Sequence, residues 1–263
     1  IMEMEHHAGR TIDQPGEVRW RRRYQYALAS NRLLATSAPN DQDNLPPYVA
    51  TPGYSQRYSY DSHGNMTQMP HLSLMSWDFK DQLHAASQQV RADGGTSETT
   101  YYLYDAGGQR VRKVTERQAA PGQPPRRKSE RIYLGGYEIY REYNGDGATV
   151  TLERETLHVM DDQQRIALVD TQTAPTIGQP LIRYQFNNHL GSASLEMDEN
   201  SELIAYEEYY PYGTSAFQTG RSAAEVSLKR YRYTGKERDE ETGFSYHGAR
   251  YYVPWLGRWV SCD

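Results

Sequence analysis

The chain has a single cysteine, Cys262, among its 263 residues, so an internal disulfide is excluded. Phenylalanine is also scarce, with four residues against 23 tyrosines. Each Tyr ring ends in a hydroxyl that needs water or a polar partner when it is buried. This composition favours sheets with at least one polar face over a solid apolar core.

Long apolar runs are missing as well. No stretch approaches the roughly 18 apolar residues that span a membrane, so direct membrane insertion is not expected. The first residues lack the basic-then-apolar pattern of a signal peptide. We expect the chain to be a segment of a longer protein that has been cut at both ends. The net charge of −5 argues against a nucleic-acid partner. Because metal-ligand and cofactor motifs are also missing, we expect no cofactor.

What the sequence does contain is a repeat. The segment Tyr60–Met66 (YDSHGNM) matches Tyr104–Arg110 (YDAGGQR), and Trp77–Leu83 (WDFKDQL) is a degenerate copy. Each copy predicts a β-hairpin, because the Asp accepts hydrogen bonds from the turn backbone and the Gly takes the positive-φ position. A single hairpin cannot bury a face, so successive copies must stack.

Other parts of the chain follow the same rhythm. The turn segments 144–147 (NGDG), 161–164 (DDQQ) and 199–202 (ENSE) each separate two runs of β-forming residues. No segment has the periodicity of a helix of three turns. The sequence therefore predicts an all-β fold of antiparallel hairpins with negligible helix.

The last third of the chain resembles the core domain that is associated with RHS repeats in bacterial RHS/YD-repeat proteins. Six short motifs occur in the family's order: NHLGS (188–192), YYPYG (209–213), YTGKE (233–237), DEETG (239–243), ARYY (249–252) and GRW (257–259). Segments 76–83, 131–141 and 152–158 resemble the C component of ABC-type (Tc) insecticidal toxin complexes. The resemblance implies a repeat shell over residues 1–183 and a core domain over residues 184–263, truncated before its end.

In this family the repeats form a curved, hollow β-shell around a toxic polypeptide, and the core domain closes it. The resemblance implies a secreted toxin complex that sequesters a C-terminal toxic cargo. Its partners would be that cargo and a shell-forming B component, or preceding repeats. We also expect a wet, Tyr-lined inner face. Two alternatives stay open: the RHS shell of a contact-dependent antibacterial effector, and an extracellular carbohydrate-binding adhesive β-protein.

Asp263 is the sharpest candidate for chemistry. In the family, the motif Gly-Arg-aromatic-x-Ser-x-Asp continues to a second Asp, and both carboxylates form an intramolecular aspartyl protease that frees the toxic region. That chemistry needs two close carboxylates that share one proton. The pair is incomplete here because the second Asp is absent, so no activity is expected from this chain. Arg258 would orient or charge-stabilise Asp263; alternatively, both residues simply end the last strand.

Other charged clusters lead to weaker predictions. Glu207-Glu208, Asp161-Asp162 and Asp239–Glu241 suggest glycosidase pairs, but adjacent strand residues point to opposite faces. We therefore expect these clusters in turns and on wet faces. Arg19–Arg23 (RWRRR) predicts a basic strand face or interior patch, and His189 is expected to form structural hydrogen bonds.

Overall fold

The computed structural model describes residues 1–9, 11, 14, 16–162, 164–176 and 178–262. Within these residues the helical content is the five-residue helix α1 (Ala223–Ser227) and the 3-10 turn η1 (Tyr233–Gly235). Strand pairing is antiparallel except between β2 and β4, whose bounds are given below. The predicted all-β fold of antiparallel hairpins is confirmed.

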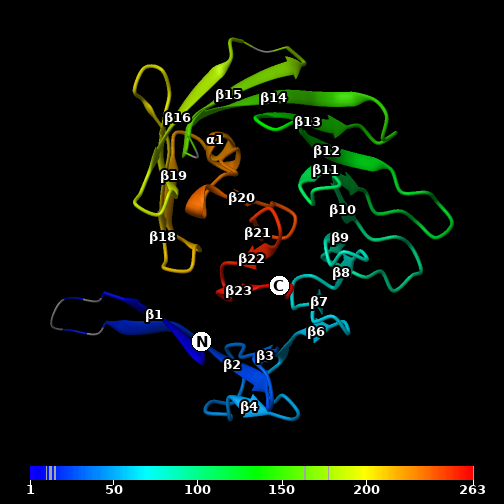
Figure 1. Ribbon diagram of the computed structural model, residues 1–263, viewed down its shortest axis with the longest axis vertical. Coiled ribbons are helices and arrows are strands. Elements are labelled where there is room, and N and C mark those ends of the chain that lie inside the picture. Colours follow the sequence, from blue (N-terminus) through cyan, green and yellow to red (C-terminus); the bar gives the residue numbers. More distant parts are fainter. Residues whose placement is uncertain (10, 12–13, 15, 163, 177, 263) are drawn as a thin grey trace.

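The largest sheet has 12 strands, each hydrogen-bonded to the next strand along the chain. These strands are β8 (Leu74–Trp77), β9 (Leu83–Ser87), β10 (Thr99–Tyr104), β11 (Arg110–Glu116), β12 (Arg127–Tyr133), β13 (Tyr137–Tyr143), β14 (Val150–Asp161), β15 (Gln164–Ala174), β16 (Leu181–Asn187), β17 (Ala193–Met197), β18 (Leu203–Tyr209) and β19 (Ser215–Gly220). Figure 1 shows that this sheet bends into an open arch, and we call it the arch below. The arch runs through residues 183 and 184 within β16, and the division into two domains there stays a prediction.

Smaller sheets precede and follow the arch. A five-stranded sheet contains β1 (Glu3–Ala8), β2 (Glu17–Ala27), β3 (Leu33–Thr36), β4 (Tyr48–Val49) and β5 (Gln56–Arg57), and a separate hairpin contains β6 (Ser59–Tyr60) and β7 (Met66–Gln68). A four-stranded sheet contains β20 (Glu237–Arg238), β21 (Ser245–Tyr246), β22 (Tyr251–Val253) and β23 (Arg258–Trp259). In Figure 1, α1 and this last sheet lie inside the arch.

One turn design recurs between the strands. An Asp or Asn side chain at the first turn position accepts a hydrogen bond from the backbone N–H two residues later, four residues later, or both. The residues are Asp61, Asp78, Asp105, Asn144, Asn188 and Asp198. Three residues further on, the backbone φ is positive in all six turns. The sequence repeat predicts three of these turns, and the same chemistry serves the other three.

Each of these six turns is preceded by a one-residue register shift in the strand pairing. Such a shift is a β-bulge, which bends the strand and increases its right-handed twist. Because the bulges recur between successive strands, they favour a curved sheet over a flat one.

The apolar core lies between the amino-terminal sheets, the first strands of the arch and the carboxy-terminal sheet. Its fully buried members include Leu33, Met66, Leu83, Phe244 and Val260, which come from both ends of the chain. The backbone N–H of Met66 also donates to the carbonyl of Val260 at 2.8 Å. The last strands are therefore part of the main core.

The basic segment Arg19–Arg23 lies on β2, where it faces the acidic strand β1. Arg23 is paired with Glu3 in the strand register, and its Nε lies 2.6 Å from a carboxylate oxygen of that residue. Arg21 is paired with Glu5 and hydrogen-bonds to it. The predicted basic strand face is confirmed, and β1 neutralises much of its charge.

The recurring turn leads to a stability prediction for Asp105, whose Oδ1 accepts from the Gln109 N–H at 2.9 Å. Asp105→Ala should lower the free energy of unfolding by about 1 kcal/mol, because that N–H loses its acceptor. Asp105→Asn keeps the oxygen and should change stability much less. Urea denaturation of the three proteins tests this, and equal stability of wild type and Asp105→Ala would contradict it.

The glycine position of the turn can be tested separately at Gly191. Its φ is +73°, and an added Cβ would meet nothing within 4 Å. Gly191→Ala should therefore cost roughly 1–2 kcal/mol through backbone strain alone. Urea denaturation measures the loss, and an unchanged midpoint would show that the left-handed conformation is not required.

Candidate functional site: a buried charge network inside the arch

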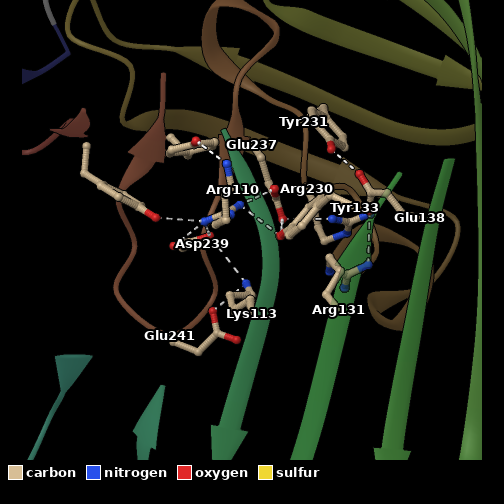
Figure 2. A network of polar contacts seen from close by, with 12 residues as sticks. Arg110, Lys113, Arg131, Tyr133, Glu138, Arg230, Tyr231, Glu237, Asp239 and Glu241 are labelled. Carbon is tan, nitrogen blue, oxygen red and sulfur yellow. Dashed lines mark hydrogen bonds and ion pairs between the residues drawn. The ribbon is translucent and has the colours of Figure 1, made fainter. Parts of the chain in front are cut away.

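Charged side chains on the inner face of the arch meet charged side chains of the C-terminal segment, by which we mean residues 229–262. Figure 2 shows the centre of this network. The arch contributes Arg110, Lys113, Arg131, Tyr133 and Glu138, and the C-terminal segment contributes Arg230, Tyr231, Glu237, Asp239 and Glu241. The contacts join β11, β12 and β13 to residues that lie about a hundred positions later in the chain.

Arg110 on β11 is the hub of the network. Its Nη1 lies 2.9 Å from Asp239 Oδ1, and its Nη2 lies 2.5 Å from Glu237 Oε2. Nη2 also donates to the hydroxyl of Tyr133 at 2.9 Å. Burial alone would lower the pKa of Arg110, but the nearby acids, Asp239 first, raise it well above its usual value. Lys113 adds a second cation, 2.8 Å from Glu241.

Glu237 connects this hub to a second arginine. Its Oε1 lies 2.9 Å from Nη1 of Arg230, whose Nη2 lies 2.6 Å from Glu138 on β13. Tyr231 donates a hydrogen bond to the other oxygen of Glu138. Burial would raise the pKa of Glu237, but Arg110 and Arg230 outweigh it and hold the pKa at about 2.

A second buried cluster ties the C-terminal segment to the far side of the arch. Lys229 Nζ lies 3.2 Å from Glu207 Oε2 on β18, and Arg232 Nη1 lies 2.8 Å from Glu207 Oε1. The side chains of Lys229 and Glu207 have no exposed surface. Nearby on the arch, Arg183 lies 2.5 Å from Glu196, again with both side chains fully buried.

These contacts correct two predictions. Glu207 and Asp239 were expected in turns or on wet faces. Asp239 does begin a turn, at residues 239–243, but both side chains are fully buried and paired with cations. Their partners come from distant segments, so local spacing gave no sign of them. The predicted alternation itself is correct, because Glu207 is buried while its neighbour Glu208 is exposed, and the pair at positions 161 and 162 is exposed in a turn.

The expected wet, Tyr-lined inner face is also wrong where the C-terminal segment covers the arch. Tyr133 and Tyr140 are present there, but their rings lie beside arginines: Arg110 is 4.8 Å from the first ring centroid and Arg131 is 4.5 Å from the second. The covered surface is ion-paired.

The ionisation of Glu237 decides what this residue can do chemically. A carboxylate that stays ionised cannot donate a proton near neutral pH, so Glu237 acts as a fixed negative charge.

The predicted catalytic residues are only partly described. Arg258 on β23 is half-buried, its Nη2 donates to the carbonyl of Asn31 at 2.8 Å, and its guanidinium lies 5.4 Å from the ring centroid of Tyr26. Asp263 lies outside the described residues, so its pairing with Arg258 stays a prediction. His189 is exposed and makes no side-chain hydrogen bond to any described residue, so its predicted structural role is wrong.

Metal-ligating clusters and membrane-spanning helices are both absent from the described residues. No group of three or more His, Cys, Asp or Glu side chains is arranged to hold a metal ion. Within the same residues, no helix is long and apolar enough to cross a membrane.

The pKa of Glu237 predicts how stability responds to acid. A carboxyl with a folded pKa near 2 and an unfolded pKa of about 4.3 contributes about 3 kcal/mol above pH 4.5, and this is lost as pH falls toward 2. Glu237→Gln should be less stable at pH 7 and lose less stability between pH 5 and 2.

Denaturant midpoints measured across this pH range test the prediction. Glu240→Gln is the matched control, because Glu240 is exposed in the same segment. Parallel pH profiles for wild type and Glu237→Gln would contradict the assignment.

Comparison with known proteins gives an independent view of the chain. No family model matches it. It is 35% identical over 235 residues to toxin subunit YenC1 of Yersinia entomophaga, which covers 89% of this chain and 22% of the relative. It is 26% identical over 205 residues to the tRNA nuclease WapA of Bacillus subtilis strain 168, covering 78% of this chain and 8% of the relative. The chain thus spans about a fifth of the length of YenC1.

Among solved structures, the crystal structure of TcdB2–TccC3 aligns with the whole chain, at a TM-score of 0.78 and 26% sequence identity. The match covers 12% of that chain. Fold and sequence therefore agree with the resemblance drawn from the motifs. The chain is an RHS/YD-repeat segment, and over nearly its whole length it is similar to the C component of ABC-type (Tc) insecticidal toxin complexes.

Proposed function

We propose that this chain forms part of the wall of a hollow toxin shell that encloses a C-terminal toxic polypeptide. The observation that carries the proposal is the arch, whose inner face is covered by the C-terminal segment of the same chain. Two similarities support it: YenC1 is a toxin subunit, and the aligned structure contains TccC3 together with TcdB2. A secreted toxin complex would be the setting.

The 12-stranded sheet of the arch has an open strand edge at β19. Among the described residues, β19 is hydrogen-bonded to a strand on one side only, which is β18. Unpaired strand edges associate readily with other strands. We infer that further repeats, or a shell-forming B component, continue the wall and complete the enclosure.

The charge network would fix the C-terminal segment in one position inside this wall. Arg110, Glu237, Arg230 and Glu138 form an alternating chain of charges, in which each acid lies against two cations or more. A shift of the segment by one strand position would bury unpaired charges, which is strongly unfavourable. A fixed segment would keep the cargo on the inner side.

We further propose that Asp263 supplies one carboxylate of a self-cleaving aspartyl pair in the longer protein, with Arg258 as its orienting residue. The support is the sequence motif at residues 257–263.

A second candidate function, the shell of an antibacterial effector, draws support from the similarity to WapA, a tRNA nuclease. The residues that follow the core domain separate the two: their purified product would be toxic to insect cells in the first case and to bacteria in the second.

Enclosure can be tested in the longer protein, produced together with its B component. The C-terminal polypeptide should resist added protease in the native complex and become sensitive after Arg110→Ala, because that change leaves Glu237 and Asp239 buried without their main cation. Lys128→Ala is the control, since Lys128 forms an exposed pair with Glu98. Equal cleavage of the C-terminal polypeptide with and without an intact shell would overturn the proposal.

Self-cleavage is tested in the same longer protein on a denaturing gel. Asp263→Asn should abolish release of the C-terminal region and leave the shell folded, because one carboxylate must be ionised while the other is protonated. Arg258→Ala should slow release less than Asp263→Asn does. Two bands from the Asp263→Asn protein would remove Asp263 from the mechanism without affecting the enclosure proposal.

A further inference from the structure

The turns of two of the six sequence motifs, at Asn188–Ser192 and Tyr233–Gly235, have no role in the function proposed above, yet the structure brings them together. The N–H of Thr234 donates to Ser192 Oγ at 2.9 Å, and the N–H of Ala193 donates to the carbonyl of Arg232 at 3.1 Å. A cavity of about 340 Å³ lies at this junction. That volume is within the range of about 300–1,000 Å³ that is usual for ligand sites.

The backbone at the cavity is strained. Thr234 has φ 50° and ψ 29°, the left-handed conformation, which is a genuine outlier for a β-branched residue. Such a conformation costs of order 1–3 kcal/mol and persists only where its surroundings impose it. Here the hydrogen bond to Ser192 holds the Thr234 turn against the Asn188–Ser192 turn, which joins β16 to β17. Strain of this kind clusters at active sites and ligand clamps.

The charges at the cavity are of one sign. Arg165 and Lys236 line it, and its described lining residues include no Asp or Glu. Neither cation forms an ion pair with a carboxylate of the described residues, whereas Arg110 and Arg183 on the arch and Arg230 on the C-terminal segment all do. The two cations therefore leave uncompensated positive charge in a partly enclosed space.

Arg165 is also held in place. Its Nε donates to Nδ1 of His158 at 3.0 Å, and its guanidinium lies 3.6 Å from the ring centroid of Tyr231. Burial lowers the pKa of Arg165, and the nearby Tyr231 and Glu138 offset only part of this effect. An anion in the cavity would supply the missing countercharge. Gln185 and Asn187 also line the cavity. Each amide already donates one N–H, to Glu196 and to the carbonyl of Arg165 respectively, and each has a second N–H.

We propose that this cavity is a binding site for a small oxyanion, held by Arg165 and Lys236 between the Asn188–Ser192 turn and the Thr234 turn. The oxyanion is either a free tetrahedral anion or a carboxylate. Because the ligand contacts both turns, its binding would lock the start of the C-terminal segment to the arch.

Calorimetric titration of the chain with inorganic phosphate, and in parallel with glutarate, tests the proposal at low ionic strength. We expect saturable binding that sodium chloride of equal ionic strength does not reproduce. Tighter binding of phosphate would identify a free tetrahedral anion as the ligand, and tighter binding of glutarate would identify a carboxylate. Heat no greater than that of chloride for both probes would overturn the proposal.

Variants assign the binding to the cavity. Arg165→Met and Lys236→Met should each weaken it at least tenfold, while Lys80→Met, which removes an exposed charge on another turn, should leave it unchanged. Lys236 is exposed, so its variant should fold even if Arg165→Met does not. Unchanged affinity in Lys236→Met, or equal weakening in Lys80→Met, would place the anion elsewhere.

Discussion

The pairing of Arg110 with Glu237 and Asp239 is the constraint on which the interior depends. The Arg110 side chain is 1% exposed, and the two acids are 4% and 0% exposed. Bringing such charges out of water is expensive, and removing one partner of a buried pair typically costs about 3–5 kcal/mol. Neither the arch nor the C-terminal segment can therefore present this surface alone. Each needs the other to neutralise it.

Two different interactions hold the C-terminal segment. Its later strands enter an apolar core with Leu33, Met66 and Leu83, while its earlier residues enter the charge network. Tyr251 belongs to both: its ring packs against Phe244, and its hydroxyl accepts a hydrogen bond from Nη1 of Arg110 at 3.2 Å. At this position Tyr does what Phe could not, because its ring fills the apolar side while its hydroxyl serves the polar side.

The sequence predicted what is decided locally. The turns at Asp61, Asp78 and Asp105 follow from a few neighbouring residues, and with them follow the hairpins and the all-β fold. The charge network could not be predicted in this way, because Arg230 and Glu138 are 92 positions apart and their pairing depends on the path of the chain. One local signal for a buried charge was available: a Glu that lies between apolar residues of a predicted strand, such as Glu138 between Tyr137 and Ile139.

The connection of the arch has a consequence for the order of folding. Each arch strand pairs with the next along the chain, so these contacts close short loops and can form as the polypeptide leaves the ribosome. The contacts of Arg110 close loops of 127 and 129 residues, and their closure entropy is paid only once residues 237–239 exist. The arch would thus form progressively, and the C-terminal segment would dock onto it in one step, after residue 239 has been synthesised.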